Sequence, residues 1–279
     1  MAKKLPSLSQ MLLPTLFSMG RGVKITERGI DLHRSFDEVK LELAKMQAFA
    51  DFLGSENKAP LSYLYCLAQR AQIAVMLEKE FTIALPGMVH LENILEEFAL
   101  WSPEKAFQIE VSIEVEYKHE GALIPRCQVD FIQDAKKVAS CSSVYMARRK
   151  SKISGKKKET PIQSFPDSIL TQAWEIAGNT GRGYAKVSGD SNPIHTHGFL
   201  AKLMGFKRPI AHGWYMTSRA VIAAETSLEK EIKRIEVAFY SPVFLPSHQK
   251  FSLFNIDSGL GFSIQNSSGK LVLQGRLLE

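Results

Sequence analysis

Three side chains in this sequence have the types and spacing needed for acid–base chemistry. Asp190, Asn192 and His195 fall within six consecutive residues, on a turn favoured by Gly189 and Pro193. A carboxylate and a neutral imidazole held together can position and activate one water molecule. The spacing therefore predicts addition or removal of water next to a carbonyl group, with Asp190 and His195 acting jointly as acid and base.

A second turn, Pro209–Gly213, follows and opens an apolar segment with helical character. The backbone N–H groups of a helix N-terminus are free to bind a developing oxyanion, and a glycine there lets a carbonyl approach closely. Gly213 is therefore the candidate oxyanion donor. His212 is predicted either to hold the turn or to contact substrate, and these two readings stay open.

The two turns carry a family resemblance. Residues 184–195 read Y-A-x-x-S-G-D-x-N-P-I-H, and residues 205–213 read G-F-x-x-P-I-x-H-G. This pattern resembles the hydratase-2 signature of MaoC-like (R)-specific enoyl-CoA hydratases and dehydratases. The resemblance implies reversible hydration of trans-2-enoyl thioesters to (R)-3-hydroxyacyl thioesters, with no cofactor and no metal. It covers about thirty residues directly.

The remaining residues near the turns divide into supporting and substrate-contacting candidates. Supporting roles in the loop are expected for Ser188, Gly189, Asn192, Pro193 and His212. Arg182 lies between two glycines and could reach a phosphate of coenzyme A or lie on a flexible basic turn. Other candidate substrate contacts are Lys207, Arg208 and Trp214, of which the tryptophan departs from the Met or Leu common in related hydratases and could shorten an acyl tunnel.

A metal site is the alternative use of the same loop. Asp190, His195 and His197 could be imagined as a ligand set. The two histidines are two residues apart, which suits a strand better than a helix, and the sequence offers no fourth ligand. We therefore expect no metal.

Composition and charge limit the classes of protein to which this sequence can belong. The 279 residues are 45% hydrophobic and 23% charged, as in a globular protein with a substantial core. No run approaches the roughly 20 apolar residues of a membrane span, and the N-terminus lacks a signal-peptide pattern, so a cytoplasmic location is expected.

The formal net charge of +6 favours an anionic partner. Three cysteines without metal-type spacing predict buried or half-buried reduced thiols: Cys66, Cys127 and Cys141.

The basic run Arg148–Lys158 holds seven basic residues and no acid, and it reads as a solvated linker. It divides the chain into an N-terminal domain at residues 1–147, a linker at 148–164 and a catalytic domain at 165–279. In the second half a helix is predicted over Gly213–Leu228. Strands are predicted around 235–239 and over 251–256, 261–265 and 271–277, with a hairpin turn at 266–269.

The first half shows a similar order. A helix is expected over Val89–Leu100, with strands over 107–117, 124–132 and 138–146. Pro86–His90 is matched to the Pro209–Gly213 turn. This repetition predicts a duplicated α+β unit. The resemblance implies a tandem double hot-dog, in which each half is an antiparallel sheet wrapped around a central helix. Because no S-G-D-x-N-P-x-H precedes Pro86, the first half is expected to be catalytically silent.

Three function hypotheses follow. The first is the hydratase or dehydratase, acting on thioesters of coenzyme A or acyl carrier protein, with a possible homodimer implied by the family. The second is a non-catalytic acyl-thioester binding protein on the same fold, which would not need the Asp190–His195 pair. The third is a nucleic-acid binder driven by the basic run. Because that run has no interleaved aromatic residues, we expect no nucleic-acid partner.

Overall fold

The computed structural model describes residues 4–21, 29–118, 122–148 and 168–279. The predicted linker lies, from residue 149 onward, outside the described residues. Spatial proximity divides the chain into two compact units. The N-terminal unit comprises residues 1–43 and 64–156, and the C-terminal unit comprises residues 44–63 and 157–279. A segment from the first quarter of the sequence thus belongs to the C-terminal unit, and the domain boundaries predicted above remain a proposal.

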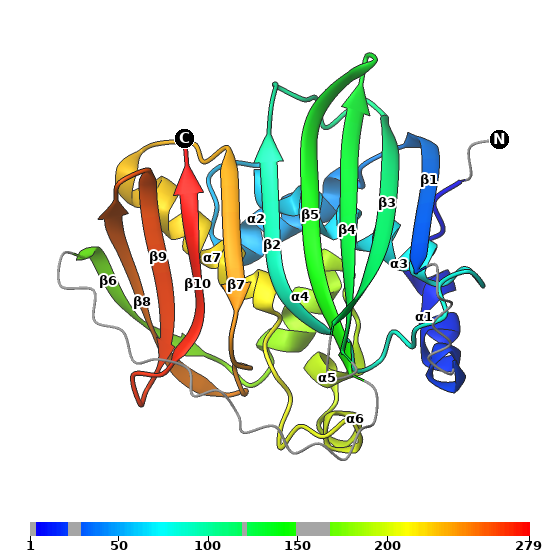
Figure 1. The fold of residues 1–279 in the computed structure, drawn as a ribbon. Helices are drawn as coiled ribbons and strands as arrows, with labels where there is room; N and C mark the ends of the chain where they lie inside the picture. The colour runs from blue at the N-terminus through cyan, green and yellow to red at the C-terminus, as the bar shows by residue number, and fades with distance from the viewer. Residues whose placement is uncertain (1–3, 22–28, 119–121, 149–167) are drawn as a thin grey trace. The chain divides into compact units, whose positions relative to one another are not determined.

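The N-terminal unit is built on five antiparallel strands in the order β1-β3-β4-β5-β2. Their bounds are β1 Ile30–Val39, β2 Val89–Glu97, β3 Phe107–Lys118, β4 Ala122–Gln133 and β5 Lys136–Arg148. The helix α3 (Leu64–Met76) packs against β3 and β4, and Figure 1 shows it behind these strands. The short helix α1 (Leu8–Phe17) and the 3-10 turn Ser18–Gly20 also belong to this unit, whereas the 3-10 turn Leu61–Tyr63 belongs to the C-terminal unit.

The C-terminal unit has five antiparallel strands in the order β7-β10-β9-β8-β6. Their bounds are β6 Ser168–Ile176, β7 Arg234–Phe239, β8 Ser247–Ile256, β9 Gly259–Asn266 and β10 Leu271–Leu278. The helix α7 (Gly213–Leu228) packs against β7 (Figure 1). The other helices are α2 (Leu43–Leu53), α4 (Thr180–Ser188), α5 (Pro193–Thr196) and α6 (Gly198–Leu203).

The two units share one connectivity. In each, the first strand forms one edge, a helix follows, the second strand forms the opposite edge, and the last three strands form a meander between them. This identity of strand order confirms the predicted duplication and the α+β, double hot-dog class. The helix predicted over Gly213–Leu228 is confirmed, as is the turn at Asn266, whose carbonyl accepts the Gly269 N–H at 2.9 Å.

Alternation of apolar residues explains why the strands of the N-terminal unit were predictable. Ile109, Val111 and Ile113 of β3 are each at most 2% exposed. They lie opposite the buried Phe131, Val129 and Cys127 of β4, so successive inward residues form cross-strand pairs. Full burial of one such aliphatic side chain contributes about 1.5–3 kcal/mol. The three cysteines are all buried and free, as expected.

The helix expected over Val89–Leu100 is wrong. Residues 89–97 form the strand β2, paired antiparallel with β5, and the buried Asn93 and Leu95 recur with the two-residue period of a strand. The match between Pro86–His90 and Pro209–Gly213 fails for the same reason, because Pro86–His90 leads into a strand and Pro209–Gly213 into a helix. The helix that packs on this sheet is α3, whose buried apolar residues recur at helical spacing.

Glu225, near the C-terminal end of α7, gives the fold a testable pH dependence. Burial raises the pKa of this carboxyl to about 7, and one of its oxygens accepts the Ile232 N–H at 3.2 Å. A folded-state pKa above the unfolded value means that stability falls as pH rises from about 4.5 through 7. Glu225→Gln, which keeps the acceptor, should therefore raise the free energy of unfolding by up to about 3 kcal/mol above neutral pH.

Chemical denaturation of wild type and Glu225→Gln at acid and alkaline pH measures this effect. The gain should vanish at the acid end, where Glu225 is protonated. Glu229→Gln, at an exposed position just beyond the same helix, is the matched control and should show no gain. A gain of equal size at both pH values would show that titration of Glu225 is not its cause.

Candidate active site

The loop that carries Asp190 begins where α4 ends. Gly189 has φ 83°, in the left-handed region that glycine adopts readily, and its N–H donates to the Ala185 carbonyl at 2.9 Å. The Ser188 hydroxyl donates to the Tyr184 carbonyl at 2.8 Å and accepts the Asp190 N–H at 3.2 Å. Ser188 and Gly189 therefore turn the chain out of the helix and fix the backbone of Asp190.

The next turn starts a short helix at Asn192. The Asn192 N–H donates to Oδ1 of Asp190 at 3.2 Å, and Oδ1 of Asn192 accepts the Ile194 N–H at 3.3 Å. Asn192 is thus the N-cap of α5, with Pro193 at a position that favours helix initiation. These contacts place His195 on α5, five residues beyond Asp190 in the chain.

The hydrogen bonds of His195 determine which ring nitrogen is available for chemistry. Its Nδ1 lies 2.8 Å from the carbonyl oxygen of Ile210. A carbonyl oxygen only accepts, so Nδ1 carries the proton and Nε2 of the neutral ring keeps its lone pair. Burial lowers the pKa of His195, against the opposing influence of the Asp190 carboxylate and the Ile210 carbonyl. The ring is therefore held neutral with Nε2 free to accept a proton.

His212 contacts both Asp190 and His195. Its Nε2 donates to the Asp190 carbonyl oxygen at 2.9 Å, and its ring stacks on that of His195 with centroids 3.7 Å apart. The side chain is 3% exposed, and burial together with the nearby His195 lowers its pKa to about 3. These contacts favour the turn-holding reading of His212, and they fix Asp190 and His195 relative to each other.

Gly213 is the first residue of α7, where backbone N–H groups lack partners inside the helix. A Cβ atom on Gly213 would come within 2.7 Å of the Phe239 ring. The packing of β7 against the start of α7 therefore requires a glycine at this position. The close approach of a substrate carbonyl to the backbone would require one as well. The positive end of the helix dipole at this point favours a developing negative charge.

Among the described residues, one group of potential metal ligands comprises Asp190, His195 and His212, whose ligand atoms lie within 4.8 Å of one another. His197, considered in the sequence analysis, is exposed and its Nδ1 contacts the Thr196 hydroxyl at 2.7 Å. The His212 Nε2, 4.0 Å from an Asp190 carboxylate oxygen, carries the proton of its bond to the Asp190 carbonyl and cannot ligate an ion. The donor set thus suits a polarised water better than a metal.

The predicted substrate contacts lie in different environments. Trp214 is 3% exposed and its indole N–H donates to the Ser62 carbonyl at 2.8 Å. Arg182 is exposed on α4, so the flexible basic turn considered for it is wrong: the flanking glycines are helical. Lys207 and Arg208 are exposed just before Pro209, and the Arg208 guanidinium lies 5.9 Å from the centre of the Phe244 ring.

The helix α2 is a part of the site's support that the sequence analysis missed. Its Phe49 ring lies 5.8 Å from that of Tyr184, and its Phe52 ring lies 6.4 Å from Tyr184 and 6.0 Å from Tyr215. Tyr184, 2% exposed, in turn contacts the His212 ring at 4.8 Å. The helical spacing of Met46, Phe49 and Ala50 was the available signal, because all three are buried.

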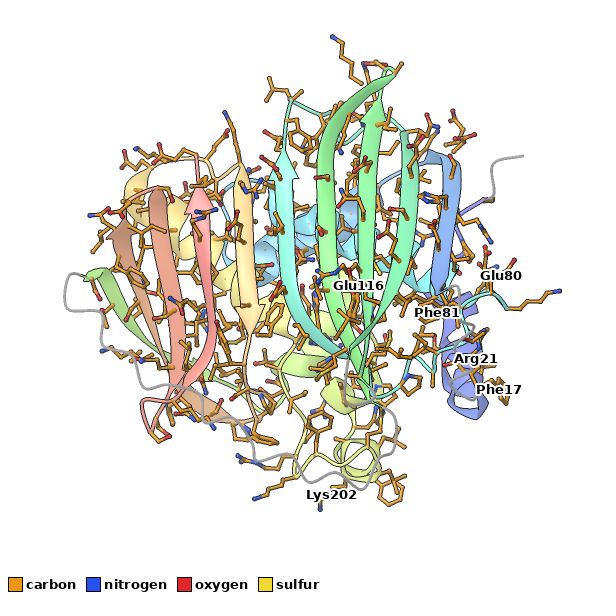
Figure 2. All side chains as sticks on the ribbon, in the orientation of Figure 1. Phe17, Arg21, Glu80, Phe81, Glu116 and Lys202 are labelled. Atoms are coloured by element: carbon orange, nitrogen blue, oxygen red, sulfur yellow. The ribbon has the colours of Figure 1, made fainter. Side chains whose placement is uncertain are left out.

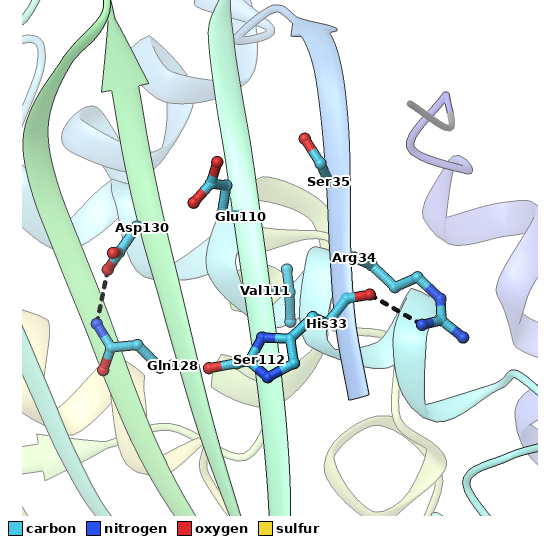
Figure 3. A pocket seen from close by; sticks show the side chains of 8 residues that line it. All are labelled: His33, Arg34, Ser35, Glu110, Val111, Ser112, Gln128 and Asp130. Atoms are coloured by element: carbon cyan, nitrogen blue, oxygen red, sulfur yellow. Dashed lines mark hydrogen bonds between the residues drawn. The ribbon is translucent and has the colours of Figure 1, made fainter. Parts of the chain in front are cut away.

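An open hollow on the N-terminal unit is unrelated to the predicted residues (Figure 3). It is lined by polar side chains on the outer face of β1, β3 and β4, including His33, Ser112 and Gln128. The Gln128 amide donates to Asp130 at 2.8 Å, and the Arg34 guanidinium to the His33 carbonyl at 2.8 Å. His33 and Asp31, 3.0 Å apart, are about two-thirds exposed. Such solvated pairs form an ordinary polar sheet surface.

Comparison with known proteins agrees with this fold. Residues 161–272 match the family model described as MaoC like domain. This part of the chain is thus similar to MaoC-like dehydratase domains, and it contains all of the candidate site residues from Arg182 to Trp214.

Individual relatives extend the likeness beyond those residues. The 3-hydroxyacyl-thioester dehydratase X of Mycobacterium tuberculosis is 26% identical over 236 residues, covering 82% of each chain. A crystal structure of that protein, HtdX, matches 88% of this chain and 99% of its own with a TM-score of 0.72 and 22% identity. A MaoC-like dehydratase from Phytophthora capsici matches 90% and 96% of the two chains with a TM-score of 0.68 and 18% identity. None of the described helices is long and apolar enough to span a membrane.

Proposed function

We propose that this chain catalyses the reversible addition of water to trans-2-enoyl thioesters, giving (R)-3-hydroxyacyl thioesters. The observation that carries the proposal is the pairing of Asp190 with a His195 whose Nδ1 is committed to the Ile210 carbonyl. This geometry leaves a carboxylate oxygen of Asp190 and a ring nitrogen of His195 within 4.8 Å of each other, a separation that one water molecule can bridge. The named activity of the Mycobacterium tuberculosis relative supports the same chemistry.

In the hydration direction the pair removes a proton from water as its oxygen attacks C3. Nε2 of His195 and the Asp190 carboxylate share that proton and deliver it to C2, so that atoms and charge balance over the cycle. Negative charge collects on the thioester oxygen during attack, and the Gly213 N–H is the donor proposed to stabilise it. One such donor contributes about 3 kcal/mol to lowering a barrier.

The other predicted residues either hold the loop or offer charges to the substrate carrier in this proposal. Ser188, Gly189, Asn192 and Pro193 hold the loop, and His212 holds the Asp190 backbone. Arg182, Lys207 and Arg208 are exposed cations that suit the phosphates of a thioester carrier. A homodimer is part of the proposal only as an expectation from the family. No cofactor is required, because the thioester itself supplies the electron-withdrawing carbonyl.

The direct test is the loss of enoyl-thioester absorbance when the purified protein is mixed with crotonyl-coenzyme A and longer homologues, followed by chiral analysis. Formation of the (R)-3-hydroxyacyl product supports the proposal and ranks acyl-chain lengths. A folded protein that binds these thioesters without turning them over, on either coenzyme A or an acyl carrier protein, would instead be a non-catalytic binder.

The pH dependence of hydration should report the state of His195. Burial lowers the His195 pKa, so the neutral ring persists below the ordinary value of about 6.5. We expect kcat/KM to stay level as pH falls to about 6.5 and to decline only at lower pH, when the pair gains an extra proton. Steady-state rates across the pH range test this, and a decline that begins above neutral pH would contradict it.

A further inference from the structure

An exposed apolar surface lies beside the candidate site on α6. Phe199 is 74% exposed, Leu200 37% and Leu203 68%, all within the six residues of Gly198–Leu203. Positions 199, 200 and 203 are spaced three and four residues apart, so the three side chains share one face of the helix. Single exposed apolar residues are ordinary, but three clustered on one short helix mark a binding surface. We call these three residues the α6 surface.

The exposed charges of the segment that carries the α6 surface are all positive. Residues 178–213 contain a single acid, Asp190, which is part-buried in the site. The basic residues of the same segment are all exposed: Arg182, Lys186, Lys202, Lys207 and Arg208. Figure 2 shows Lys202 projecting from α6 into solvent. An apolar surface within a segment whose exposed charges are all positive is complementary to an acidic protein that has its own apolar contact residues.

The chain connects the α6 surface directly to the catalytic pair. The helix α6 starts three residues after His195, and the Ala201 N–H donates to the His197 carbonyl at 2.9 Å. Ala201 is fully buried, so α6 is anchored by its inner face while its outer face is free to bind. A partner on this outer face would be next to the loop that holds the reacting groups.

We infer that the α6 surface docks an acidic carrier protein that presents the acyl group as a thioester. This inference rests on the proposed function, since it names the carrier of the same substrate. Coenzyme A is a small ligand whose phosphates need only cations, whereas three large exposed apolar side chains offer the wider contact that a protein partner covers. A carrier protein uses both features, because its acidic side chains meet the cations and its apolar residues cover Phe199 and Leu203.

The test compares one acyl group on two carriers. Rates are measured with the enoyl group on a purified acidic acyl carrier protein and on coenzyme A, for wild type, a Phe199→Ser/Leu203→Ser double variant and Lys202→Glu. Leu100→Ser, at an exposed leucine of the N-terminal unit, is the matched control. We expect each α6 variant to lose at least about ten-fold in kcat/KM on the carrier protein and less than about two-fold on coenzyme A. The control should change neither rate.

The other outcomes overturn the inference in distinguishable ways. Equal losses on both carriers would show that α6 maintains the site rather than docking a protein, and no loss on either would show that the surface is unused. Wild type that turns over only coenzyme A esters would end the docking inference and leave the proposed function standing. No turnover of either would end the proposed function itself. Loss of a homodimer or of anionic-vesicle binding in the double variant, with carrier-protein rates intact, would assign the surface to that occupant instead.

Discussion

Replacing His195 by asparagine should lower kcat/KM for enoyl-thioester hydration by about 10³- to 10⁴-fold. The asparagine amide nitrogen can replace Nδ1 in the hydrogen bond to the Ile210 carbonyl, so the loop should keep its conformation. What is lost is Nε2, the lone pair that accepts the proton. Stopped-flow or steady-state absorbance gives the rate, and circular dichroism with thermal melting checks the fold.

The matched control is His197→Asn, the same substitution two residues away at an exposed histidine. It should retain nearly the full rate. Asp190→Asn should lose a similar amount to His195→Asn, and the double variant should lose little more, because residues that act as a unit are not additive. A folded His195→Asn protein with wild-type turnover would remove His195 from the mechanism.

Gly181→Ala should be the most damaging substitution that replaces neither acid–base residue. Gly181 lies in α4, and a Cβ atom there would overlap the carbonyl oxygen of His195 and come within 3.3 Å of the Leu245 side chain. The alanine must therefore push α5 away from α4. A displacement of about 1 Å of a catalytic group costs on the order of 10² in rate, and overpacking costs about 1–3 kcal/mol of stability.

Gly178→Ala provides the control for this prediction. A Cβ at Gly178 meets its nearest neighbour, Pro246, at 3.8 Å, which is ordinary van der Waals contact. It should leave the rate unchanged. Kinetics and denaturation of both variants are the measurement, and a Gly181→Ala protein with unaltered kcat and stability would show that the close contact between α4 and α5 does not position His195.

Local sequence chemistry made the loop that carries Asp190 and His195 predictable. Gly189 occupies a left-handed position, Asn192 caps α5 and Pro193 starts it, and each of these roles depends on residue types close in sequence. The helix at Gly213–Leu228 was predictable for the same reason. The strands β3, β4 and β5 followed from alternation, because one face of each is buried against α3 or its neighbours.

The rest depended on contacts between residues distant in sequence. The stacking of His195 on His212 and the bond from His212 to the Asp190 carbonyl join two turns that are separated by α6. The packing of Phe49 against Tyr184 brings in a helix from more than a hundred residues earlier. The strand β2 was mistaken for a helix because its apolar residues fit both periods, and only its pairing with β5 decides between them.

The most direct test of the central claim is to follow the oxygen of isotopically labelled water into the product. Mass spectrometry of the hydroxyacyl thioester formed by the wild-type protein should show one labelled oxygen, located at C3, with a solvent hydrogen at C2. His195→Asn should form this product at no more than about a thousandth of the wild-type rate. Label that fails to reach C3, or that arrives equally fast in the folded variant, would contradict the assignment of Asp190 and His195 as the pair that activates water.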